Sequence, residues 1–69
     1  MQELLEELHT DVSKSDQVIQ IWTEFEEIHL LYKDSEDNKV YHTIFGIWRV
    51  GGHLERFQQS RKAVTLWAK

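Results

Sequence analysis

The sequence predicts a small α+β domain with an N-terminal helix, an antiparallel sheet of two or three strands, and a C-terminal helix. Three observations predict this fold. They are an amphipathic stripe near the start of the chain, a run of β-branched and aromatic residues in the middle, and a second helical stripe after a Gly-Gly pair. The 69 residues suffice for one domain spanning 1–69. The alternative is an all-α protein of four short helices.

The first helix is expected over residues 2–13. Leu4, Leu5, Leu8 and Val12 recur with the spacing of one helical face. Three glutamates near the start of this segment are favourably placed at the positive end of the helix dipole. The pattern therefore predicts a helix that packs one apolar stripe against the rest of the domain.

Residues 17–33 are ambiguous between helix and strand. At 3.6 residues per turn one stripe forms, and at period 2 Ile28, Leu30 and Tyr32 alternate with polar or outward positions. A strand reading needs two strands or a bulge, because a single strand of this length would be far longer than usual. Gly, Pro and Asn are absent between Phe25 and Ile28, where such a turn would fall.

The middle of the chain predicts a hairpin. Residues 34–38 are five consecutive polar residues typical of a loop, and residues 39–50 are rich in β-branched and aromatic side chains. Pairing this strand with residues 28–33 places Tyr32 near Tyr41 and Leu30 near Thr43. Gly46 inside the strand indicates a bulge or the close approach of another group.

After Gly51-Gly52 the pattern favours a helix from His53 to about Ala68. Arg61 falls on the apolar face and weakens the stripe, which is formed by Leu54, Phe57, Val64 and Ala68. Basic residues in this segment complement the C-terminal end of a helix dipole. The alternative for residues 63–67 is a short closing strand.

Composition excludes several classes of protein. The chain has no cysteine, so disulfides and thiolate metal or redox sites are excluded. Its apolar runs are too short for a transmembrane helix, and its acidic start does not fit a secretory signal, so we expect a cytoplasmic protein with no membrane association. A domain this small has a limited core, and we expect it to self-associate as a homodimer.

Charge is unevenly distributed along the chain. Residues 1–38 carry eleven acids and two bases, whereas residues 39–69 carry six bases and one acid. The two halves could neutralise each other, or an acidic face could meet a basic partner. Tryptophan is also abundant for so small a core, and Trp, Tyr and Arg dominate interface hot spots.

These features predict a non-enzymatic acidic module that binds another protein. It would be an inhibitor of the type encoded by phages and mobile elements. The expected partner-binding residues are Glu24, Glu26, Glu27, Trp22, Trp48 and Trp67. Each tryptophan could equally belong to the core.

The first alternative function is nucleic-acid binding by the basic C-terminal segment. Its cations alternate with aromatics, a pattern that suits phosphate contact and base stacking. The expected contact residues are Arg49, Arg56, Arg61 and Lys62. The net charge of −4 opposes long-range attraction to nucleic acid.

The second alternative is a small helical metal-binding protein. Glu6-Glu7-Leu8-His9 and Glu26-Glu27-Ile28-His29 each contain Glu-x-x-His, the spacing used by di-iron carboxylate bundles. Ligands of such a site must point into the core, and these pairs lie off the apolar stripes. We therefore expect no metal and no cofactor. The chain has no nucleophile turn and no phosphate-binding glycine loop, so we do not expect an enzyme.

Overall fold

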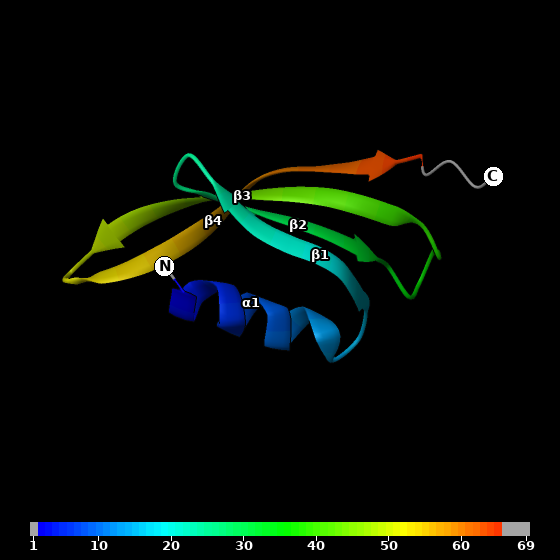
Figure 1. The fold of residues 1–69 in the computed structure, drawn as a ribbon, viewed down its shortest axis with the longest axis horizontal. Helices are drawn as coiled ribbons and strands as arrows, with labels where there is room; N and C mark the ends of the chain where they lie inside the picture. Colours follow the sequence, from blue (N-terminus) through cyan, green and yellow to red (C-terminus); the bar gives the residue numbers. More distant parts are fainter. Residues whose placement is uncertain (1, 66–69) are drawn as a thin grey trace.

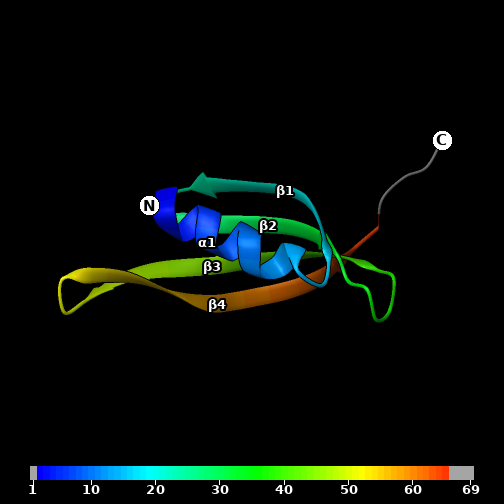
Figure 2. The same cartoon turned by 90° about the horizontal axis from the view of Figure 1, so that it is seen from below.

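The computed structural model describes residues 2–65, which form one helix followed by four strands. The elements are α1 (Gln2–Ser13), β1 (Gln17–Glu24), β2 (Glu27–Lys33), β3 (Val40–Val50) and β4 (His53–Val64). The strands form one antiparallel sheet in the order β1-β2-β3-β4, and α1 lies along one face of it (Figures 1 and 2). The N-terminal helix is therefore confirmed, within an α+β fold.

The predicted C-terminal helix is wrong, because its described part is strand β4. Gly51 and Gly52 have φ angles of 54° and 88°, which two-residue hairpin turns require. The turn folds β4 back along the full length of β3, from Val50 opposite His53 to Val40 opposite Val64. Backbone pairing along eleven residues of β3 outweighs the imperfect helical stripe. Residues 66–68 of the predicted helix lie outside the described residues.

The strand count and the all-α alternative are also corrected. The sheet has four strands rather than two or three, because residues 17–33 form two strands joined by a turn at Phe25 and Glu26. The periodic stripe through this segment does not form a helix, since β2 is a central strand hydrogen-bonded to both β1 and β3. The predicted register is confirmed, with Tyr32 opposite Tyr41 and Leu30 opposite Thr43.

The core lies between α1 and the face of the sheet that α1 contacts, which we call the covered face. Four apolar side chains are buried there: Leu8 of α1 and Ile28, Leu30 and Tyr32 of β2. Partly buried residues from α1, β1 and β3 surround them. The core is small because one helix of twelve residues supplies its second layer. No helix among the described residues is long and apolar enough to cross a membrane.

The connections are fixed by side-chain hydrogen bonds. Asp16, between α1 and β1, accepts a hydrogen bond from the backbone N–H of Ser35 in the β2–β3 loop (2.8 Å). Within that loop Asp34 accepts from the N–H of Glu36 (2.7 Å). The predicted loop at residues 34–38 is confirmed, and it is hydrogen-bonded to the connection between α1 and β1.

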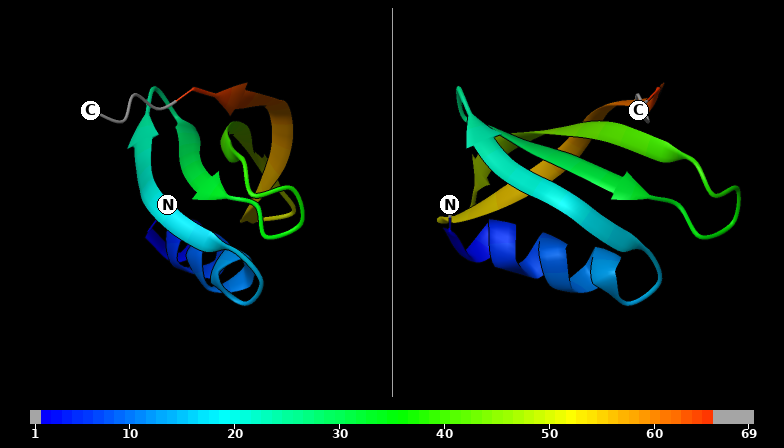
Figure 3. Two further views of the ribbon diagram at one scale, coloured as in Figure 1. Left: turned by 90° about the vertical axis from the view of Figure 1, so that its right-hand side faces the viewer. Right: turned by 45° about the vertical axis from the view of Figure 1, so that its right-hand side comes forward.

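The other face of the sheet, which we call the open face, has no described helix or strand over it (Figure 3). Strand alternation places on it the side chains of Trp22, His29, Leu31, His42, Ile44, Trp48 and Phe57. The ring of Phe57 covers Gly46, where a Cβ atom would lie 2.8 Å from Cε1 of that ring. The prediction of a close approach at Gly46 is therefore confirmed.

Candidate protein-interaction site

The turn between β1 and β2 presents an exposed aromatic side chain in an unusual backbone conformation. Phe25 and Glu26 have φ angles of 49° and 60°, the left-handed region that Asn-Gly usually occupies in such turns. A bulky residue in this region costs of order 1–3 kcal/mol. Phe25 is nevertheless 90% exposed, so no described contact offsets the cost.

Three carboxylates surround Phe25, which are the predicted partner-binding residues Glu24, Glu26 and Glu27. Glu24 and Glu27 face each other as the last pair of the hairpin, and Glu26 lies in the turn itself. We call residues 24–27 the hairpin tip. The structure thus brings the three predicted glutamates together, and it adds Phe25, which the sequence analysis did not select.

A buried histidine lies between the two flanks of the hairpin tip. His29 is 7% exposed, and its Nε2 lies 3.5 Å from Glu24 Oε1 and 3.4 Å from Glu27 Oε1. Its Nδ1 lies 2.9 Å from Nε2 of His42, so one of these two nitrogens donates a hydrogen bond to the other. Both carboxylates are near this buried Nε2 atom, but it forms no hydrogen bond with any described residue.

Trp22 covers the histidine pair from the side of β1. Its ring stacks on His29 with centroids 5.2 Å apart and on His42 with centroids 5.7 Å apart. The cluster therefore joins β1, β2 and β3 on the open face, directly behind the hairpin tip. Packing of the three rings across these strands would reduce the entropy that the tip loses on binding.

The other predicted tryptophans lie elsewhere. Trp48 is 56% exposed and meets Phe57 edge to face, with centroids 5.8 Å apart. Both Trp22 and Trp48 lie on the open face, so neither belongs to the core beneath α1. Trp67 lies outside the described residues.

The four predicted nucleic-acid contacts do not form one surface. Arg56 pairs with Glu7 (3.1 Å) and Asp11 (3.5 Å) of α1. Lys62 follows the alternation of β4 onto the open face, whereas Arg49 borders a groove beside the start of α1. Nucleic-acid binding stays a prediction, and these positions give it no continuous basic surface.

Arg61 is also held by groups of the protein. It donates to Tyr32 Oη (2.8 Å), pairs with Asp34 (2.9 Å) and lies 3.7 Å from the ring centroid of Tyr41. The hydrogen bond to Tyr32 raises the pKa of Arg61. Together with the pairs of Arg56, these contacts show that the basic C-terminal half partly neutralises the acidic first half.

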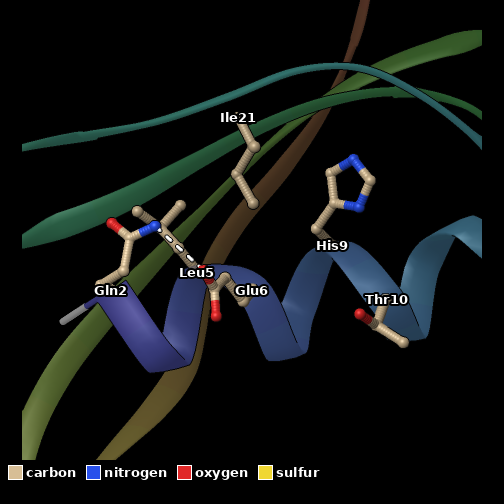
Figure 4. A pocket seen from close by; sticks show the side chains of 6 residues that line it. All are labelled: Gln2, Leu5, Glu6, His9, Thr10 and Ile21. Carbon is tan, nitrogen blue, oxygen red and sulfur yellow. Dashed lines mark hydrogen bonds between the residues drawn. The ribbon is translucent and has the colours of Figure 1, made fainter.

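The two Glu-x-x-His pairs do not combine into a metal site. Glu6 and His9 lie on α1, beside an open groove of about 520 Å³ that Ile21 closes from the sheet (Figure 4). Glu26 and His29 lie in a turn and a strand, so their helical spacing has no meaning here. Among residues 2–65, no three His, Asp or Glu side chains are grouped so as to hold a metal ion.

Comparison with protein-family models, with curated proteins and with solved structures finds no match for this chain. The function must therefore be argued from the geometry of the hairpin tip and of the open face.

Proposed function

We propose that the protein is a non-enzymatic interaction module that uses the hairpin tip to bind a basic protein. The observation that carries the proposal is Phe25, which is 90% exposed in a turn whose backbone conformation does not suit phenylalanine. Strain of this kind persists where the surrounding structure imposes it, and it is concentrated at functional sites.

The chemistry of the tip indicates the kind of partner. An exposed aromatic ring can enter an apolar pocket, and aromatic anchors dominate interface energetics. The carboxylates of Glu24, Glu26 and Glu27 would meet lysines or arginines around that pocket, which favours fast association. If the pocket lies in a nucleic-acid-binding groove, occupation by the acidic tip would inhibit its owner.

The test begins by identifying the partner. Benzoylphenylalanine at position 25 should cross-link one protein in the native host, and the same group at Ser35 in the β2–β3 loop should not. The captured protein is then purified, and its affinity for the unmodified chain is measured by calorimetry at 50 and 500 mM salt. The affinity should fall at high salt, because salt screens pairs between exposed charges.

Replacement of the turn separates binding from folding. Phe25→Asn combined with Glu26→Gly installs the residues that this turn type prefers, so the free energy of unfolding should rise by about 1 kcal/mol. Affinity for the captured partner should fall at least tenfold. Glu36→Gly removes an exposed acid from the other loop and is the matched control, with unchanged affinity.

Two results would overturn the proposal. One is a turn variant that binds the captured partner as tightly as the original chain. The other is equal cross-linking from positions 25 and 35, since that would show contact without a specific site.

A further inference from the structure

The open face carries apolar side chains that a folded monomer leaves in water. Trp48, Val50 and Phe57 are 56%, 40% and 43% exposed. Since an aromatic side chain presents 150–250 Å², the two rings together leave roughly 150–250 Å² exposed. This is about a quarter of the area of roughly 800 Å² that each partner buries in a typical stable interface. Trp22, Leu31 and Ile44 of the same face are partly exposed and extend the patch.

Charges on the open face are separated into two ends. Glu24 and Glu27 lie at the end nearest the hairpin tip, and Glu55 lies beside Trp48 in the same direction. Lys33 and Lys62 lie at the opposite end, beside the β2–β3 loop. Glu27 and Lys33 are six residues apart on β2, which is roughly 20 Å along a strand.

Neither lysine forms an ion pair with any of the described residues. On the covered face, by contrast, Arg56 and Arg61 are both paired with carboxylates. The open face therefore has an acidic end that also carries the exposed rings of Trp48 and Phe57, a middle with the partly exposed Leu31 and Ile44, and a basic end that pairs with no described carboxylate.

Such a surface is complementary to itself after a half-turn. In a two-fold dimer each subunit contributes the same patch, so the acidic end of one copy would lie on the basic end of the other. The axis would pass near His29 and Leu31, midway between the two charged ends. Two sheets packed in this way lie about 10 Å apart with their side chains interdigitated.

We propose that two copies of this chain associate open face to open face, in antiparallel orientation. The proposed interface shares only Glu24 and Glu27 with the hairpin tip, because Phe25 and Glu26 lie in the turn beyond the paired ends of β1 and β2. In such a dimer the second copy also supplies the second layer that the open face of the first copy lacks. Failure of one proposal leaves the other standing.

Sedimentation equilibrium provides the first test. The wild type should have twice the 8.3 kDa mass of one chain at concentrations of tens of micromolar. Lys33→Glu combined with Lys62→Glu makes both ends of the face acidic, and should weaken dimerisation at least tenfold. Lys14→Glu with Arg49→Glu changes the charge equally away from the open face and is the matched control, which should remain dimeric.

Mixing complementary variants tests the orientation. Glu24→Lys with Glu55→Lys makes the other end basic, and this variant should also dissociate. An equimolar mixture of the Lys-to-Glu and Glu-to-Lys variants should form a heterodimer, because opposite charges meet again at both ends. Recovery on mixing also shows that each variant is folded.

The absence of cysteine permits a direct test by cross-linking. Leu31→Cys would introduce a single thiol near the proposed axis, and a short bis-maleimide should join two such chains quickly. Thr10→Cys on α1 is the control and should remain uncoupled. A wild type that sediments as a monomer would overturn the proposal, as would a dimer that is indifferent to the lysine reversal or that cross-links equally at both positions.

Discussion

In the core between α1 and the covered face of the sheet, Leu8, Ile28 and Leu30 are at most 3% exposed, whereas on the open face Trp48 and Phe57 are 56% and 43% exposed. The charges differ in the same way. Arg56 and Arg61 on the covered face are paired with carboxylates, and the lysines of the open face are not paired with any described residue. One face is thus complete within a single chain, and the other presents groups that a partner could satisfy.

The histidine pair is the exception on the open face. His29 is buried without help from α1, because Trp22 and His42 stack around it. Its Nε2 lies within 3.5 Å of Glu24 and Glu27 at the base of the hairpin tip. The open face therefore has a buried cluster behind the tip on β1–β3 and exposed aromatic rings on the neighbouring part of β3 and β4.

The largest expected effect in this comparison is the loss of Leu8. Leu8→Ala removes the one fully buried side chain that α1 contributes, and substitutions of this kind cost about 2–5 kcal/mol. A domain this small has roughly 3–5 kcal/mol of net stability, so the variant should lose most of its free energy of unfolding at 25 °C. Urea unfolding followed by circular dichroism measures the change. The control is Thr10→Ala on the exposed side of α1, which should change the free energy of unfolding by less than about 0.5 kcal/mol. An equally small effect of Leu8→Ala would show that α1 is not part of the core.

The open face should respond more weakly and through one specific contact. Gly46→Ala places a methyl group against the ring of Phe57, and overpacking of this kind costs about 1–3 kcal/mol. In a Phe57→Ala background the same change should cost less than about 1 kcal/mol, because only the flexible side chain of Gln59 then lies against the new methyl group. The double-mutant cycle measures this coupling by urea unfolding. Equal costs in the two backgrounds would mean that Phe57 does not lie over Gly46.

Sequence reasoning located the covered face better than the open one. The stripe through Leu4, Leu8 and Val12 predicted α1, and alternation predicted the register that places Leu30 opposite Thr43. The sequence wrongly predicts a helix where β4 lies, because the Gly-Gly pair after the β3 strand is interpreted as the end of the sheet. In a two-residue loop the same pair is a strong hairpin signal.

The hairpin tip could not be predicted for a different reason. Its two turn residues, Phe25 and Glu26, are among the least suited to positive φ, so no local signal marks a turn there. The turn is determined by the pairing of β1 with β2 and not by its own two residues. The contact between His29 and His42 was accessible in principle, because the predicted register of β2 and β3 makes these two residues diagonal neighbours.

The smallest expected effect comes from the loop at the basic end of the sheet, and it depends on pH. Tyr41 donates a hydrogen bond to Asp37, and this bond, with that from the backbone N–H of Lys39, lowers the pKa of Asp37 below 3.8. Because the folded state binds this proton more weakly than the unfolded chain does, the stabilisation is present above pH 3.8 and is lost as the pH falls through the lowered pKa. Urea midpoints of the wild type and Asp37→Asn should therefore differ near pH 6 and converge in strong acid.

The same hydrogen bond predicts the opposite dependence at high pH. It raises the pKa of Tyr41 above 10.0, so its stabilisation is present below pH 10 and is lost as the pH rises through the raised pKa. Tyr41→Phe removes the hydroxyl while keeping the ring that Arg61 covers, and in this background Asp37→Asn should have little further effect. Because the hydrogen bond between Tyr41 and Asp37 is exposed, solvent screens the interaction, and the shift should be far smaller than that of Leu8→Ala. An Asp37→Asn effect of undiminished size in the Tyr41→Phe background would show that Asp37 acts through the Lys39 backbone instead.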